Sequence, residues 1–193
     1  ILDSITLTNS ISIAVDDILP TLDLSIDDLN DGYRDVNQNL YLGNTPNNYV
    51  TGLSNVAIGL QALNANASGN YNVAVGANTL INSLGSEQTA VGGYALHENT
   101  NGYQNNAFGY YALKANTTAS LNNAFGSGSL MANTTGCCNV SMGNDAMRFN
   151  VTGDGNVAIG NKALYCNNGS TPDFNVAIGR QAMYSTTTGT RNV

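Results

Sequence analysis

The chain has 193 residues, of which 10% are charged and 7% aromatic, with 21 glycines and no tryptophan. So few charged and large apolar side chains disfavour a thick conventional core and are typical of a thin β-solenoid or an extracellular fibre. The net charge of −7 falls entirely within residues 1–38, and the neutral remainder argues against nucleic acid or an anionic membrane surface as a partner.

Residues 1–38 predict an acidic, strand-rich connector or cap. Apolar and polar residues alternate through ITLTNSISIAV at 5–15, and they alternate again after Pro20, as in half-buried strands. The acidic pairs Asp16-Asp17 and Asp27-Asp28 match no calcium-loop spacing, so we interpret them as a solvated acidic face. No metal site is expected.

Residues 39–193 consist of a repeat whose landmark is the glycine of the motif N-x-A-x-G. The intervals between successive glycines are 16, 17, 16, 17, 17, 17, 17 and 19 residues. Asn192 and Val193 begin a further unit, so we expect the chain to continue beyond them. The repeat predicts an all-β solenoid, a β-roll of about nine coils with about 17 residues each. The glycines are Gly43, Gly59, Gly76, Gly92, Gly109, Gly126, Gly143, Gly160 and Gly179.

Each unit contains a short strand, N-V-A-I, followed by a leucine or methionine four residues after the glycine. Because neighbouring strand residues face opposite ways, Ala57 and Ile58 cannot serve the same surface. We expect the Ile/Val/Phe column and the Leu/Met column to fill the interior. The alanine column is then expected to face outward, against a neighbouring chain.

The polar positions of the repeat also predict structure. Two glycines per unit suit the corners, and an asparagine recurring at 66, 99, 116, 133 and 150 is expected to stack as an amide ladder. Seventeen residues with two glycines cannot hold a helix pair. Such a narrow coil buries little apolar surface, so we expect several chains to share burial.

The repeat N-x-A-[IVFM]-G-x-x-A-L-x-x-N-T-T-G resembles the coil repeat of YadA-like heads in trimeric autotransporter adhesins. The ANTTG linker at 132–136 and the stretch DLNDGYRDVNQNLYLGN at 28–44 are similar to segments of phage and viral tail fibres. The resemblance implies a homotrimer. It also implies a fibre in which such repeats often precede a self-cleaving chaperone of endosialidase type.

The function expected from this resemblance is structural and adhesive. The chain would be part of a virion tail fibre that joins other fibre or virion proteins, projects a receptor-binding tip and contacts a host glycan or protein. The head of a bacterial surface adhesin is the alternative. A monomeric ice-binding solenoid is a third hypothesis, because threonines recur in pairs at 117–118, 134–135 and 187–188. Adjacent threonines face opposite ways, which disfavours a flat array.

No residues with catalytic or cofactor-binding spacing are evident, and we expect no enzyme activity and no cofactor. His97 is interpreted as a surface residue. Glu98, its neighbour in sequence, would face the opposite way in a strand and so could not join it in a catalytic triad or a metal site. Cys137, Cys138 and Cys166 are expected to be free, buried thiols, although bridging between chains stays open.

Within each unit, the residues vary freely at two pairs of positions, one directly after the motif glycine and one directly after the leucine or methionine. We call these pairs the variable slots. They are the candidate contact residues, because several contain tyrosine, and exposed tyrosine suits glycan or protein contact. The first slot includes Leu60-Gln61, Gly93-Tyr94, Tyr110-Tyr111, Asn161-Lys162 and Arg180-Gln181, and the second includes His97-Glu98, Arg148-Phe149 and Tyr165-Cys166.

Overall fold

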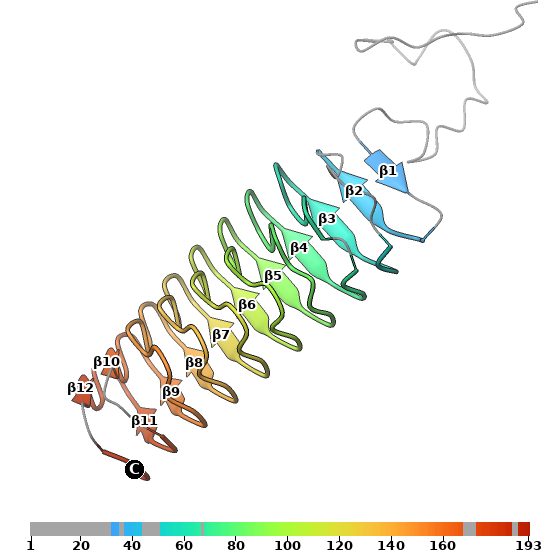
Figure 1. Ribbon diagram of the computed structural model, residues 1–193. Coiled ribbons are helices and arrows are strands. Elements are labelled where there is room, and N and C mark those ends of the chain that lie inside the picture. Colours follow the sequence, from blue (N-terminus) through green and yellow to red (C-terminus); the bar gives the residue numbers. More distant parts are fainter. Residues whose placement is uncertain (1–31, 35–36, 44–50, 67, 168–172, 187–188) are drawn as a thin grey trace, which may run out of the picture.

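The computed structural model describes residues 32–34, 37–43, 51–66, 68–167, 173–186 and 189–193. These residues form an elongated parallel β-solenoid without a helix, in which each coil lies directly against the next (Figure 1). The predicted fold class is therefore confirmed. The predicted connector lies outside the described residues except for 32–34 and 37–38.

One ten-stranded sheet runs the length of the solenoid in the order β1 to β9 and then β11. The first two strands pair antiparallel, and all later neighbours pair parallel and in register, so that Ala107 lies opposite Ala124. A small second sheet, β10 with β12, forms elsewhere on the last two coils. The strands are β1 (Gly32–Arg34), β2 (Leu40–Leu42), β3 (Val56–Ile58), β4 (Val73–Val75), β5 (Thr89–Val91), β6 (Asn106–Phe108), β7 (Asn123–Phe125), β8 (Val140–Met142), β9 (Val157–Ile159), β10 (Cys166–Asn167), β11 (Val176–Ile178) and β12 (Ser185–Thr186).

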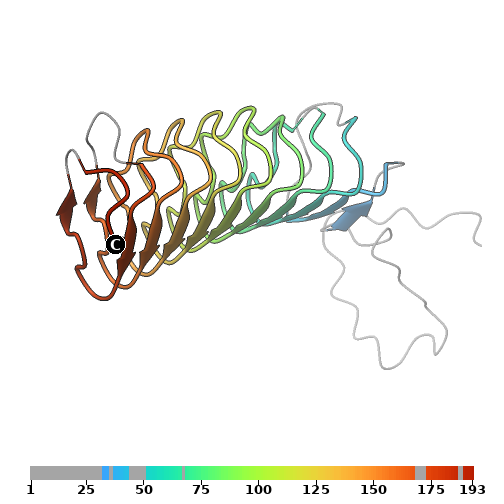
Figure 2. The same cartoon turned by 90° about the horizontal axis from the view of Figure 1, so that it is seen from below.

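Hydrogen bonds join the coils on the turn side as well as along the sheet. In the sheet, the Val56 amide donates to the Asn72 carbonyl at 2.8 Å, and in the turns the Leu63 amide donates to the Thr79 carbonyl at 3.1 Å. Viewed along another axis, the strands lie along one side and the turns along the other (Figure 2). With strands about 4.8 Å apart, the nine parallel strands extend over about 40 Å.

The alanine column is the inward face of the sheet, which corrects the expected packing. Ala74, Ala90, Ala107, Ala124 and Ala158 are completely buried, whereas the side chains on either side of them along each strand point outward. The Leu/Met column is buried as expected. The Ile/Val/Phe column, predicted to be inside, therefore lies on the surface.

Backbone conformation and the width of the coil interior explain why the columns face this way. The Leu/Met residues adopt positive φ, as at Leu96 (50°) and Leu113 (51°). This left-handed region is unfavourable for β-branched side chains, so isoleucine and valine are confined to the extended strand positions. From β3 onward, the strand position that faces the interior is always a small residue, alanine or Ser141, whereas in β2 it is the buried Tyr41.

Two asparagine ladders fill the rest of the interior. The expected ladder is confirmed: the Asn116, Asn133 and Asn150 amides each donate to the asparagine one coil before, at 2.8, 3.2 and 3.0 Å. The first asparagine of the motif forms a second ladder, which the sequence analysis did not identify. Its side-chain oxygen accepts the backbone amide of the next coil, as between Asn122 and Asn139 at 3.0 Å.

Departures from the repeat occur in matched pairs inside the core. Ser83 and Gln88 replace the two ladder asparagines of one coil, and the longer Gln88 amide reaches the Ser83 hydroxyl at 2.7 Å. Likewise Ser141 replaces a strand alanine and meets Ser129, whose hydroxyl donates to it at 2.7 Å. Each added polar group thus has a partner, as burial requires.

Three coils depart from 17 residues, and two of them differ at the same corner. The third, from Gly43 to Gly59, is one residue short between Gly43 and Gly52, a stretch that lies mostly outside the described residues. The coil from Gly76 to Gly92 has 16 residues because a single residue, Leu84, separates Ser83 from Gly85, where the other described coils have two. The coil from Gly160 to Gly179 has 19, and its extra residues lie between Asn167 and Asp173. The strands keep their register through both changes.

Candidate functional site

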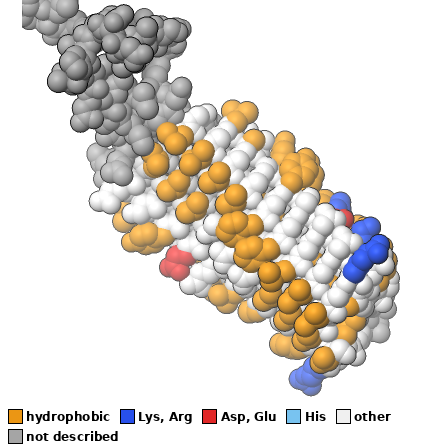
Figure 3. All heavy atoms as spheres, turned by 180° about the vertical axis from the view of Figure 1, so that it is seen from behind, with side chains coloured by type: hydrophobic (Ala, Val, Ile, Leu, Met, Phe, Trp, Pro, Cys, Tyr) orange, Lys and Arg blue, Asp and Glu red, His pale blue; other side chains and the backbone are white. Residues whose placement is uncertain are grey.

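The outward face of the sheet is the most extensive candidate surface. We call it the sheet face and define it as the two outward columns of strands β2 to β9 and β11. Figure 3, which views the molecule from behind Figure 1, shows hydrophobic side chains in rows along the solenoid. One column is Leu42, Ile58, Val75, Val91, Phe108, Phe125, Met142, Ile159 and Ile178, and the other is Leu40, Val56, Val73, Thr89, Asn106, Asn123, Val140, Val157 and Val176.

The sheet face leaves large apolar groups in contact with water. Phe108 is 36% exposed, Met142 44% and Ile178 69%. Phe108 and Phe125 stack on neighbouring strands with ring centroids 4.9 Å apart and planes at 6°. Exposed apolar surface of this kind is typical of interaction sites, which makes the sheet face a candidate interface.

No charged residue occurs in either column of the sheet face. Its polar members are neutral and partner one another, since the Asn106 amide donates to the Asn123 side-chain oxygen at 2.9 Å. Parallel strands with both faces apolar are normally buried on both sides. Among the residues that the structure describes, only one side of this sheet is covered.

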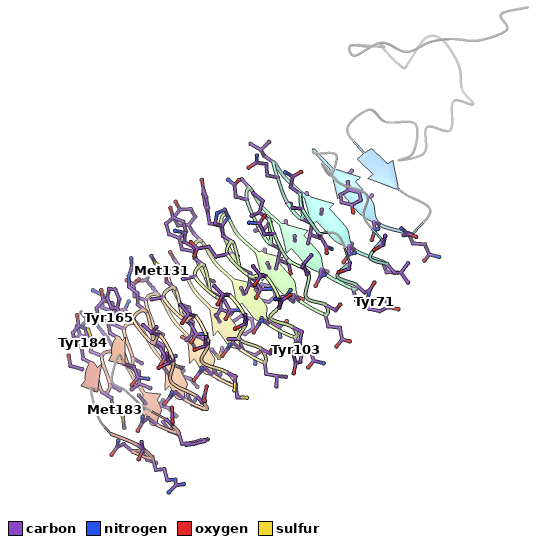
Figure 4. All side chains as sticks on the ribbon, in the orientation of Figure 1. Tyr71, Tyr103, Met131, Tyr165, Met183 and Tyr184 are labelled. Atoms are coloured by element: carbon purple, nitrogen blue, oxygen red, sulfur yellow. The ribbon has the colours of Figure 1, made fainter. Side chains whose placement is uncertain are left out.

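The variable slots after the motif glycine and after the Leu/Met column lie in turns, away from the sheet face. Met131, Tyr165 and Tyr184 mark the edge formed by the second slot, while Tyr71 and Tyr103 lie along the opposite edge (Figure 4). The predicted contact residues therefore share one turn region. Among them, tyrosines concentrate in the coils that contain residues 93–98 and 110–114.

We call the first aromatic group the tyrosine patch: Tyr94, His97, Tyr110 and Tyr111, with Glu98 and Lys114 beside them. Ring centroids are 3.9 Å apart for Tyr110–Tyr111, 5.3 Å for Tyr94–Tyr111 and 5.2 Å for Tyr94–His97. A hydrogen bond with Tyr111 is the main cause that raises the pKa of the Tyr110 hydroxyl, so this hydroxyl stays protonated at neutral pH.

His97 is half-buried, in keeping with a surface role, and its Nδ1 lies 3.0 Å from the Asn78 carbonyl oxygen. Because a carbonyl oxygen only accepts, Nδ1 carries the proton and Nε2 is the acceptor of the neutral ring. Within the described residues there is no group of three or more His, Cys, Asp or Glu placed to hold a metal ion.

A second aromatic group lies near the C-terminal end of the described solenoid. Tyr165 and Tyr184 stack at 4.9 Å with planes at 16°, and Phe149 meets Tyr165 edge-on. The Lys162 ammonium lies 5.4 Å from the centroid of the Tyr165 ring. The Tyr165 and Tyr184 rings are nearly parallel, whereas the rings of the tyrosine patch are tilted relative to one another.

The three cysteines are free, as expected, but the expectation that they are buried is wrong. Cys138 is exposed, whereas Cys137 and Cys166 are half-buried. The Cys137 and Cys138 sulfurs are 3.1 Å apart at the corner before β8. Their hydrogen bond, with burial, raises the pKa of Cys137 to about 12, which keeps this thiol protonated at neutral pH.

The threonine pairs do not form a flat array in the described coils. The Thr117 and Thr134 hydroxyls donate to carbonyl oxygens of the next coil at 3.2 and 3.1 Å, while Thr118 and Thr135 are exposed. The pair at 187–188 lies outside the described residues. No single face therefore presents both threonines of a pair.

Comparison of the chain with protein-family models, with curated proteins and with solved structures found no match. No helix long and apolar enough to cross a bilayer occurs in the part of the chain that the structure describes. Sequence reasoning missed the sheet face because it assigned the Ile/Val/Phe column to the interior. The restriction of the Leu/Met column to residues without β-branching was the available signal.

Proposed function

We propose that this chain is a structural and adhesive segment of a trimeric viral tail fibre, located on the virion, which projects a receptor-binding tip towards the host. The observation that supports this proposal is the uncharged apolar sheet face, which continues over nine parallel strands. A fibre needs a rigid repeating scaffold and a surface through which copies join along their whole length.

The proposed occupant of the sheet face is the sheet face of other copies of the chain. Inside the coils from β3 to β9, the Leu/Met residue is the one fully buried large apolar side chain, so the interior alone buries little apolar surface. Joining the sheet faces would bury Phe108, Phe125, Met142 and their column neighbours at once. Complementary charges are not required, because the face has none.

The number of copies follows from the sequence motif. The repeat resembles those of trimeric fibres and trimeric adhesin heads, so we propose three chains around a common axis with the sheet faces inward. In this arrangement the variable turns, including the tyrosine patch, face outward toward other fibre components or the host surface.

Light scattering on the purified chain tests the proposal. A mass of three chains is expected, and a monomer would contradict both the interface and the fibre. A mass of two chains would retain the interface but contradict the trimer.

The double variant Phe108→Ser/Phe125→Ser identifies the surface that joins the copies. It removes two large apolar groups from the sheet face and is expected to shift the mass towards one chain. Phe149→Ser is the matched control, because Phe149 is 40% exposed, like Phe125 at 38%, but lies in a turn. Loss of the trimer in the control, or its survival in the double variant, would contradict the assignment of the sheet face.

A further inference from the structure

The tyrosine patch brings amphipathic rings and hydrogen-bonding groups together on two successive coils. Tyr110 is 50% exposed, and Tyr94 and Tyr111 are half-buried beside it. The Tyr94 and Tyr110 rings meet edge-on at 6.2 Å with planes at 89°, so the patch presents ring faces in more than one direction. A flat apolar ring carrying a hydroxyl group suits a ligand that has both apolar and polar surfaces.

The backbone of the neighbouring coil makes room for these rings. Gly93 occupies the column of Tyr110, one coil before it, where a Cβ atom would lie 3.3 Å from the Tyr110 ring. The other described coils carry side chains in this column, such as Leu60 and Ala77. The absence of a side chain at Gly93 allows the Tyr110 ring to lie across the preceding coil.

The polar groups around the rings have nearly balanced charge. The Lys114 ammonium lies 3.8 Å from a Glu98 carboxylate oxygen and 5.4 Å from the centroid of the Tyr111 ring. Glu98 is half exposed, with 50% of its side chain accessible. The His97 ring, whose centroid lies 5.2 Å from that of Tyr94, adds a further hydrogen-bonding nitrogen, Nε2. The patch therefore offers donors and acceptors without an excess of either charge.

We propose that the tyrosine patch binds a neutral hexopyranose of a cell-surface glycan, with the sugar's C–H face on the tyrosine rings and its hydroxyls on Glu98, Lys114 and His97. The ring faces match the apolar side of a pyranose, and the mixed donors and acceptors match its hydroxyl groups. Pairing of Lys114 with Glu98 disfavours an anionic sugar or a phosphate. This inference rests on the proposed function, because a host-contacting fibre needs such a ligand.

The second aromatic group also has charged neighbours, Lys162 and the Arg148–Asp145 pair, but its rings are arranged differently, so it serves as the internal comparison. Tyr165 and Tyr184 stack face to face, so neither offers its covered face to a ligand. Phe149, beside them, has no hydroxyl group. A ligand that simply adheres to aromatic rings would use both groups. A pyranose that fits the tilted rings together with Glu98, Lys114 and His97 would use only the tyrosine patch.

Binding of the intact chain to an array of neutral oligosaccharides ending in glucose, galactose, mannose or N-acetylglucosamine tests the proposal, with sialylated glycans printed beside them. Binding to at least one neutral terminus is expected, and about 0.5 M NaCl should leave it unchanged, because uncharged contacts are not screened. Tyr110→Ala should weaken binding roughly tenfold, the scale of a lost aromatic contact. Tyr165→Ala, the matched control, should bind like the unmodified chain.

Three results would overturn the inference. The chain could bind no neutral glycan, it could bind only sialylated glycans in a salt-sensitive way, or Tyr165→Ala could weaken binding as much as Tyr110→Ala. Light scattering on the same preparations separates this failure from that of the proposed function. A trimer that binds no glycan contradicts the sugar site and leaves the fibre proposal standing. A monomer contradicts the fibre, whatever it binds.

Discussion

A leucine in the left-handed region of φ recurs in almost every coil. Leu113, at φ 51° and fully buried, is representative. A Cβ-branched side chain would clash with its own backbone there, whereas leucine and methionine are accommodated at modest cost. The natural exchange of Leu for Met at this column, as at Met147, is explained by this rule.

Leu113→Ile is therefore expected to destabilise the solenoid by about 2–3 kcal/mol, although the volume of the side chain is unchanged. Leu113→Met, the matched control, should cost less than about 1.5 kcal/mol. Urea denaturation followed by circular dichroism, at one chain concentration, measures both changes. Equal costs for the two variants would show that backbone conformation does not select the residue.

The Ser83–Gln88 pair tests whether the two ladders are coupled. Gln88→Asn shortens the amide that reaches Ser83 and leaves a buried hydroxyl without this bond, at a cost of about 1–3 kcal/mol. Ser83→Asn alone should overpack against Gln88. The double variant restores the asparagines of the other coils and should be more stable than either single variant. Additive losses would mean that the two columns are independent.

At the residue scale the sequence predicts the composition of each column but not which way every column faces. Strand alternation allows two solutions, with either the alanines or the Ile/Val/Phe residues inward. The buried Ala90 and the exposed Phe108 show that the observed solution opposes ordinary hydrophobicity. Hydrophobicity failed as a guide because the width of the interior, which only the three-dimensional coil defines, limits the residue facing the leucines.

The coil is the structural element, and it tolerates length changes at a single corner. That corner lies between the ladder asparagine and the second glycine, where the coil from Gly76 to Gly92 has lost a residue and the coil from Gly160 to Gly179 has gained two. Across the described coils, the strand of the main sheet always has three residues. The Leu/Met residue always follows the motif glycine by four. Repeat length is thus predictable from the sequence, and the position of the variable corner follows from aligning the coils.

Insertion of Gly-Ser between Thr134 and Thr135, at this corner, should lower Tm by only about 2–4 °C, because loop-closure entropy rises slowly with length. The same insertion between Ala124 and Phe125, inside β7, displaces every later residue of that coil from its column and should abolish cooperative folding. Thermal unfolding followed by circular dichroism compares the two variants. Similar losses would contradict a special role for the corner.

At the scale of the whole molecule, the described residues form a one-dimensional stack in which each coil contacts mainly its neighbours. Its interior consists of alanine, amide ladders and a column of large apolar residues, and its sheet face places a second apolar column outside. Such a distribution is inverted relative to a free-standing domain, because from β3 onward the bulkier residues of each strand in the main sheet are the outer ones. Association through the sheet face would convert this inverted coil into the inner layer of a thicker assembly.

If copies join through the sheet face, the assembly should be insensitive to salt. The ion pairs among the described residues are Lys114–Glu98 and Arg148–Asp145, and both lie in turns rather than on the sheet face. Light scattering should therefore give the same trimer mass between about 0.05 and 1 M NaCl, because apolar contacts are not weakened by screening of charges. Dissociation at high salt would instead place an ionic contact at the interface, and only residues outside the sheet face could supply it.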